Sequence, residues 1–329
     1  MTKVKLRLLA ALGAFAAGVG AVVTVALLAN STLGGSSSSG SVAPPAVPPA
    51  PTASGTDAAA FPSPPPGALV LAGEDRDLAV GLAVTRRGSR LGLQASVLGQ
   101  DQPAPGLSVS FRLPGAGPVQ ARSCGTGCYR AVVDGAAARR VEVAIRGHDR
   151  PASAVTFTLP ASVPGPPAAG LVRRAAATWR SLRTLVDHDR LSSGPGATID
   201  TVWQFQAPYR LTYRIRNGPQ AVAIGGRRWD KVVGGGWQES TQDPIRQPIP
   251  LWQSVSDAHL LGSATVRGKP TSEIGFFDPR IPAWFTIWVE KATMRTLQLT
   301  MTAKAHFMHE VYGPFDSRLR IVPPRKGGA

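Results

Sequence analysis

Cysteine, histidine and methionine are scarce in this sequence, which limits the metal and redox chemistry that it can support. Its 329 residues include two Cys, five His and four Met. A structural zinc site needs four ligands, and a thiol redox motif is CxxC, whereas Cys124 and Cys128 in "RSCGTGCYR" follow a CxxxC pattern. The intervening Gly125, Thr126 and Gly127 allow a tight reversal of the chain. We therefore expect a disulfide across a hairpin tip, formed in an oxidising compartment, and no cofactor.

Motifs for catalysis are also lacking. The sequence has no Gly-x-Ser-x-Gly and no His-Glu-x-x-His, and its glycine runs are not followed by the Lys-Ser/Thr of a phosphate-binding loop. Asp187, His188 and Asp189 are adjacent, but they stand near the end of a predicted helix, where solvated charges are a better interpretation than an acid–base pair. We expect that the protein is not an enzyme.

Acidic residues are few relative to basic ones. The 20 Asp and Glu face 36 Lys and Arg, which gives a formal net charge of +16. Most of the basic residues are Arg, a bias typical of a GC-rich genome, and they are scattered without blocks of like charge. No nucleic-acid-binding motif accompanies them, so no nucleic-acid partner is expected. The charge would steer the protein toward an anionic or lipidated partner.

The N-terminus holds the one long apolar run. Residues 8–29 carry no charge and follow Lys3, Lys5 and Arg7. At ~1.5 Å per residue, about 22 residues cross the ~30 Å hydrocarbon core of a membrane, whereas a cleaved signal peptide has a shorter apolar region of ~7 to 15 residues. Residues 1–29 are therefore predicted to be a cytoplasmic stub and transmembrane signal anchor, with cleavage as the alternative. The positive-inside rule then places the bulk of the chain outside the cell membrane.

A linker and a β-sandwich are predicted next. Residues 30–67 are rich in Gly and Ser and then in Pro, with too little apolar bulk to pack, which is typical of an extended linker. Residues 68–162 alternate apolar and polar side chains in short runs separated by turn signals such as "TRRGSR" and "PGAGP". About seven such strands in roughly 90 residues, without a helical stretch, predict an immunoglobulin-like β-sandwich. The clearest runs contain Leu78, Val80, Leu82 and Val84; Leu91, Leu93, Ala95 and Val97; Leu107, Val109, Phe111 and Leu113; and Val141, Val143 and Ile145.

Residues 168–324 are predicted to form a second domain, an antiparallel half-barrel. It opens with a helix in "AAGLVRRAAATWRSLRTLVDHDRL", where apolar residues recur at spacings of three and four until Gly194 and Pro195 end the pattern. Alternating strands follow, each with one apolar and one polar face, and the helix can cover the apolar face. The predicted fold class is thus mainly β, with a transmembrane helix, a sandwich, and a curved sheet wrapped on a helix. The helical positions are Leu171, Val172, Ala175, Trp179, Leu182 and Val186.

The order of motifs in residues 171–324 resembles the LolA-like lipoprotein-carrier superfamily, whose members fold as an incomplete antiparallel barrel closed by helices. The motifs are "TWRSLRTLVDHDRL", "APYRLTYRI", "VAIGGRRWDKVVGGGWQES", "WVEKATMRTLQLTM" and "YGPFDSRLRIVPP". The tandem of sandwich and half-barrel, with "CGTGCYRA" from Cys124, also resembles the extracytoplasmic tail of actinobacterial copper-resistance D type proteins. In this sequence a single anchor stands where those proteins have a polytopic membrane domain, which puts copper transport by the chain itself in doubt.

A half-barrel of this kind implies a concave apolar face. Pockets for apolar ligands are concave and largely apolar, so its side chains could hold an acyl chain; alternatively, they form the core beneath the helix. We expect a membrane-anchored extracytoplasmic binding protein whose partner is a lipid, a lipidated protein or a membrane protein. A scaffold without a ligand is one alternative. The candidate ligand-binding residues are Trp203, Phe205, Tyr213, Trp288, Leu299 and Met301.

The stretch "AHFMHEVYGPFD" in residues 305–316 supplies another alternative, accessory copper handling. Met and His are soft ligands that suit Cu(I). Alternation in a strand, however, puts His306 and Met308 on one face and His309 on the other, so at most two of the three converge. We expect His306 to face solvent and His309 to face the interior, and we predict no metal site.

Overall fold

β-Strands make up most of the described chain. The computed structural model describes residues 63–325 apart from residues 77, 100–101, 104–105, 136, 149, 193–197 and 304–305. Within them all paired strands are antiparallel and the helix α2 (Ala169–Ser181) is the one α-helix, which confirms the mainly-β fold class. The predicted anchor and most of the predicted linker lie outside the described residues. No helix in the described part is long and apolar enough to span a membrane.

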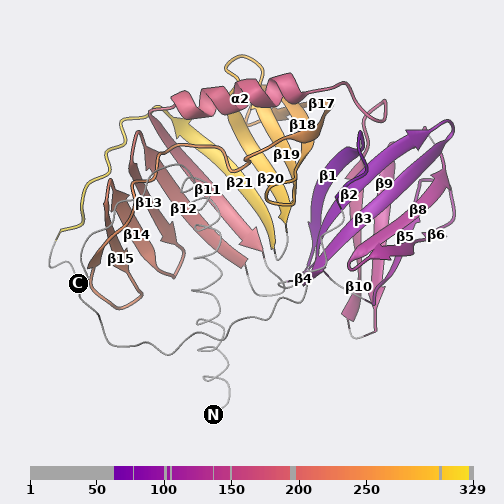
Figure 1. The fold of residues 1–329 in the computed structure, drawn as a ribbon, viewed down its shortest axis with the longest axis horizontal. Helices are drawn as coiled ribbons and strands as arrows, with labels where there is room; N and C mark the ends of the chain where they lie inside the picture. Colours follow the sequence, from indigo (N-terminus) through magenta and orange to yellow (C-terminus); the bar gives the residue numbers. More distant parts are fainter. Residues whose placement is uncertain are drawn as a thin grey trace, which may run out of the picture. The chain divides into compact units, whose positions relative to one another are not determined.

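Two antiparallel sheets form the sandwich that the alternating pattern predicts (Figure 1). Alternate side chains of both sheets, such as Leu82, Leu93, Phe111 and Val143, point into one buried core. The immunoglobulin-like assignment of this sandwich remains a prediction. One sheet has the order β1-β2-β3-β8-β7 with β4 paired to β3, and the other has the order β10-β9-β5-β6. The strands are β1 (Leu69–Asp75), β2 (Leu78–Arg87), β3 (Arg90–Gly99), β4 (Gln102–Pro103), β5 (Ser108–Arg112), β6 (Val119–Gln120), β7 (Arg122–Gly125), β8 (Cys128–Asp134), β9 (Arg140–Gly147) and β10 (Arg150–Thr158).

The predicted disulfide is confirmed. Cys124 and Cys128 are bonded, with 5.0 Å between their Cα atoms. They flank the turn between β7 and β8, where Gly127 has φ +67. Glycine adopts this left-handed conformation without steric cost, which explains why the turn can bring the two Cβ atoms together.

The predicted helix is confirmed only in its first half. Helix α2 (Ala169–Ser181) buries Val172, Ala175 and Trp179, but the chain leaves the helix at Leu182, which has an extended backbone. Thr184–Ser192 is not helical: it is strand β11. The helical spacing of Leu182 and Val186 misled the prediction, because the same segment also has a period of two.

The half-barrel is one antiparallel sheet of eleven strands together with helix α2, which lies across it in Figure 1. The strand order is β16-β15-β14-β13-β12-β11-β21-β20-β19-β18-β17, so the last of the described strands, β21, lies between β11 and β20. The remaining strands are β12 (Thr198–Gln206), β13 (Arg210–Ile215), β14 (Gln220–Ile224), β15 (Arg227–Lys231), β16 (Gln238–Thr241), β17 (Ser256–Val266), β18 (Lys269–Asp278), β19 (Ala283–Glu290), β20 (Thr296–Ala303) and β21 (His306–Phe315).

Helix α2 packs on one face of this sheet, which we call the inner face. Trp179 of the helix meets Tyr312 of β21 edge-on, with ring centroids 4.6 Å apart, and meets Trp252 at 5.8 Å. Trp252 in turn contacts Phe276 and Phe285. These rings belong to one buried apolar cluster that fills the space between α2 and strands β17 to β21. The opposite side of the sheet is the outer face.

A strap of residues 242–255 connects β16 to β17. Because these strands are the two opposite edges of the sheet, the strap has to pass from one edge to the other. The N–H of Gln247 donates to the carbonyl of Pro208 at 2.9 Å, and Trp252 is buried in the cluster beneath α2. The strap is therefore fixed both near β13 and near the helix.

Candidate functional site

Three of the candidate residues come together on the inner face of β12 and β13. Trp203 and Phe205 are stacked, with ring centroids 6.1 Å apart and planes 4° from parallel. Tyr213 is the register partner of Trp203, and their ring centroids are 4.7 Å apart. Trp203 and Phe205 are partly exposed, whereas Tyr213 is buried. We call these three residues the aromatic face.

A charged pair borders the aromatic face. The guanidinium of Arg228 donates to both carboxylate oxygens of Asp230, at 2.8 and 2.7 Å, and to the hydroxyl of Tyr213 at 3.4 Å. Burial raises the pKa of Tyr213, so this hydroxyl stays protonated at neutral pH. The inner face thus combines apolar rings with a polar group at one end.

The other three candidates lie elsewhere. Leu299 and Met301 are on the inner face but belong to the closed cluster beneath α2, at 0% and 6% exposure. Trp288 is on the outer face, because its neighbours Ile287 and Val289 both point into that inner cluster and side chains alternate along β19. The expectation that Trp288 shares a concave surface with the others is therefore wrong.

Three carboxyl groups are buried on the inner face beside the aromatic face. Asp187 and Asp189 of β11 and Glu310 of β21 are 5%, 8% and 2% exposed. Asp189 is the register partner of Glu310, and Asp187 is the partner of Tyr312. Among the described residues one oxygen of each carboxyl lacks a hydrogen-bond partner, and so does the Tyr312 hydroxyl. We call the three acidic residues the acidic cluster.

Burial makes these carboxyls weak acids. It raises the pKa of Asp189 to about 7, against a hydrogen bond from Trp203 that lowers this pKa. Burial also raises the pKa of Asp187 and Glu310 well above their ordinary values, and the neighbouring carboxyls add to both shifts. Below about pH 7 the acidic cluster is therefore largely neutral inside an apolar interior.

The sequence interpretation missed the acidic cluster because it placed Asp187 and Asp189 at a solvated helix end. The signal that would have found them is strict alternation: Leu185 and Leu191 share a face with Asp187 and Asp189, while His188 and Arg190 are exposed. Two carboxyls at apolar positions of a strand must be buried if the strand is central in a sheet.

The stretch in residues 305–316 is also reassigned. Met308 and Tyr312 of β21 face inward, while His309 lies on the outer face and is half-buried. The expectation that His309 faces the interior is therefore wrong. In the described residues no group of three or more His, Cys, Asp or Glu side chains is placed to hold a metal ion.

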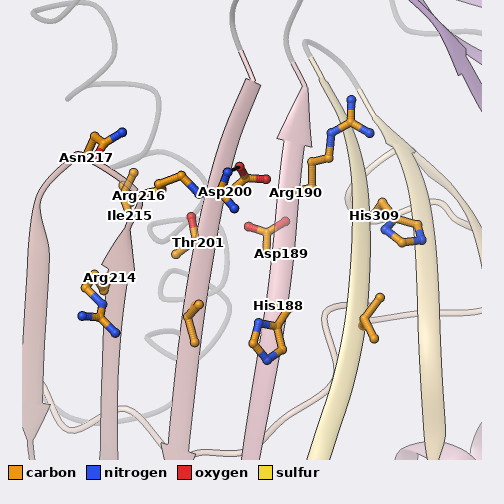
Figure 2. Close-up of a pocket in the computed structure, with 12 residues that line it drawn as sticks. His188, Asp189, Arg190, Asp200, Thr201, Arg214, Ile215, Arg216, Asn217 and His309 are labelled. Carbon is orange, nitrogen blue, oxygen red and sulfur yellow. Dashed lines mark ion pairs between the residues drawn. The ribbon is translucent and has the colours of Figure 1, made fainter. Parts of the chain in front are cut away.

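The outer face carries a pocket of about 560 Å³ over β11, β12, β13 and β21 (Figure 2). Two rows of register partners cross these strands. The pocket lies over both rows, and Figure 2 shows the side chains of these four strands around it. The first row is His309, Arg190, Asp200 and Arg216, and the second is Val311, His188, Val202 and Arg214.

This pocket is basic. Three arginines and two histidines line it, and the acidic residues in the lining are Asp189, which belongs to the inner face, and Asp200. Asp200 forms an ion pair with Arg216 at 3.1 Å. Burial, and secondly the charge of Arg190, lower the pKa of His309, so its imidazole is mainly neutral at pH 7.

Comparisons with known proteins assign no family. No protein-family model matches the sequence, and no curated protein matches it. Among solved structures, the lipoprotein LppX of Mycobacterium tuberculosis is 10% identical over 46% of this chain and 97% of its own, with a TM-score of 0.36. LprF from Mycobacterium bovis is 12% identical over 47% of this chain and 94% of its own, with a TM-score of 0.34. Each match thus covers less than half of this chain and neither identifies a ligand.

Proposed function

We propose that the half-barrel is a non-catalytic binding module for an apolar chain, and that this chain lies against the aromatic face. The observation that carries the proposal is the contrast within the inner face. Leu299 and Met301 are sealed under α2, whereas Trp203 and Phe205 are partly exposed. Large aromatic rings left partly exposed beside a buried apolar cluster are typical of a surface that binds an apolar ligand.

The strap supports this proposal. It carries half-buried Ile245, Ile249 and Leu251 and is bonded through Gln247 to Pro208, next to the end of β12. Buried Pro248 and Pro250 limit its conformational freedom. An apolar strap fixed at both ends can contact a bound chain from the side opposite the sheet.

The Arg228–Asp230 pair gives the site a polar end. An apolar pocket needs a few placed polar groups to orient its ligand. Arg228 already donates to Tyr213, and its side chain is 25% exposed, so it can meet a polar head group while the apolar chain extends along Trp203. The family resemblance to lipoprotein carriers, drawn from the sequence, implies the same class of ligand.

The proposed location is extracytoplasmic, with the chain anchored by residues 1–29. This rests on the apolar run and its basic flank, and on the disulfide, which forms readily in an oxidising compartment. The copper-handling alternative rests on the sequence resemblance and on the His and Met residues of the stretch 305–316.

Uptake of a fluorescent fatty acid by delipidated protein tests the ligand proposal. We expect saturable binding by the wild type and a loss of roughly tenfold or more in affinity in Trp203→Asp, because a carboxylate on the aromatic face opposes burial of an apolar chain. Trp203→Phe should retain binding, because it keeps an apolar ring on the aromatic face. It loses only the indole N–H that donates a hydrogen bond to Asp189.

Trp288→Asp is the matched control, because it makes the same chemical change on the outer face. Far-UV circular dichroism should establish that each variant is folded. If the wild type takes up no fatty acid, or if Trp203→Asp and Trp288→Asp lose uptake equally, the aromatic face is not a ligand site and the half-barrel is a scaffold.

A further inference from the structure

The outer pocket owes its depth to short side chains between long ones. In its second row, Val311 and Val202 alternate with His188 and Arg214. Valine is shorter than histidine or arginine, so the two valines form an apolar floor and the longer groups form a rim. Arg190 and Arg216 extend this rim in the first row.

The rim carries positive charge that the described residues only partly neutralise. Asp200 is engaged by Arg216. Arg190 attracts the carboxylate of Glu74 in β1. Burial raises the pKa of Glu74, and the charge of Arg190 offsets part of this rise. In the part of the chain that the structure describes, no acidic side chain forms an ion pair with Arg214, which is exposed. Arg190 and Arg214 thus offer two guanidinium groups to one pocket.

The positions of these two arginines suit one shared anion. They stand on β11 and β13, one row apart, with Val202 and Asp200 of β12 between them. Neighbouring strands are ~4.8 Å apart and the two rows lie two residues, ~6.8 Å, apart along the strands, so the two Cα atoms are separated by about 12 Å. Two long side chains that turn toward each other can span this gap with an anion between them. Guanidinium groups bind phosphate oxygens in a fixed, often bidentate geometry.

We infer that the outer pocket binds an organic phosphate, with the phosphate between Arg190 and Arg214 and the attached carbon group on the floor of Val202 and Val311. The volume of about 560 Å³ is in the range of small-molecule sites, so it accommodates more than the phosphate alone. The phosphate can belong to a soluble ester or to a lipid head group. This site is on the face opposite the aromatic face and does not depend on the function proposed above.

Calorimetric titration of the full chain in neutral detergent tests this inference. The probes are glycerol 3-phosphate, inorganic phosphate, dihexanoyl phosphatidylglycerol and dihexanoylglycerol, the last of which has no phosphate. We expect saturable binding of the phosphate-bearing probes and a loss of roughly tenfold or more in affinity in Arg190→Gln and in Arg214→Gln. Tighter binding of glycerol 3-phosphate would identify a soluble ester, and tighter binding of phosphatidylglycerol a lipid head group.

Arg173→Gln is the matched control, since it removes the same charge from the exposed side of α2. It should bind the phosphate probes like the wild type. The inference is overturned if no phosphate-bearing probe binds, if dihexanoylglycerol binds as tightly as phosphatidylglycerol, or if Arg173→Gln weakens binding as much as Arg214→Gln does. Failure of fatty-acid uptake at the aromatic face would leave this result unchanged.

Discussion

The two faces of the sheet at β11 and β21 carry side chains of opposite acid–base character, acidic on the inner face and basic on the outer face. Inward, Asp187, Asp189 and Glu310 are buried together. Outward, Arg190 and His309 occupy the alternate positions of the same strands and line an open pocket. A sheet only one backbone thick therefore separates an acidic cluster from a basic rim.

The difference shows how environment decides the state of a charged group. A buried carboxyl without a basic partner is cheaper to keep protonated than ionised, so its pKa rises. An arginine remains charged in any protein setting and needs water or an anion, which the open outer face provides. The carboxyls of the inner face can therefore stay protonated, while the arginines of the outer face can bind anions.

The largest effect that we predict is a pH-dependent loss of stability caused by the acidic cluster. Because the native pKa values are raised above the unfolded ones, the native state binds more protons between about pH 4 and pH 7, and the free energy of unfolding falls as pH rises through that range. The shift of Asp189 from 3.8 to about 7 alone corresponds to about 4 kcal/mol.

Replacing the three carboxyls by amides measures how much their ionisation lowers the free energy of unfolding. The triple variant Asp187→Asn, Asp189→Asn, Glu310→Gln should match the wild type in urea unfolding near pH 4 and exceed its free energy of unfolding by at least about 4 kcal/mol at pH 8. Equal stability of the two proteins at pH 8 would contradict the prediction that the cluster is forced to ionise there.

A single substitution should give a smaller version of the same effect. Asp189→Asn keeps an oxygen that accepts the N–H of Trp203 and removes one charge from the cluster. We expect it to raise the free energy of unfolding at pH 8 by about 4 kcal/mol, the cost that the shift of Asp189 represents, and to change it little at pH 4. Destabilisation at both pH values would mean that the carboxyl is structural in its ionised form.

On the outer face, replacing a carboxylate by an amide should change the free energy of unfolding only slightly. Asp200→Asn removes the partner of Arg216, whose side chain is 73% exposed. Exposed ion pairs contribute up to about 1 kcal/mol, so we expect a change below that at pH 8. A change as large as that of Asp189→Asn would erase the contrast between the two faces.

The smallest effect concerns His309. In Arg190→Gln its pKa should rise, because one of the two causes that lower it is removed, yet it should stay below the ordinary value because burial is the larger cause. NMR titration of the imidazole measures this directly. An unchanged pKa would show that Arg190 does not act on His309.

Much of the fold could be predicted from period two, because half-buried strands have one polar face. The runs around Leu82, Leu93, Phe111 and Val143 became strands with these residues in the core. The same pattern did not predict the strand at Thr184–Ser192, because its leucines and valine fit both a helix and a strand. In addition, carboxyl groups are usually exposed, so the sequence did not indicate that these are buried. Only the pairing with β21, which is distant in sequence, makes β11 a central strand.

The site was harder to predict because both faces of some strands are buried. In β19 Trp284 and Phe285 are both fully buried although they point to opposite faces, so alternation did not reveal which face Trp288 occupies. The same holds for Phe307 and Met308 of β21, which misled the placement of His309. Trp203 and Tyr213 could be found, because their strands have a polar outer face.

The alternation of charge along β11 also has a consequence for folding. A shift of one residue in the pairing of β11 would turn His188 and Arg190 toward Trp179 and the apolar cluster, and would leave Leu185 and Leu191 in water. Arginine cannot be neutralised by losing a proton, whereas the carboxyls at the correct positions can be neutralised by gaining one. Strand β11 is therefore stable in one pairing register, and a register shifted by one residue is strongly destabilised.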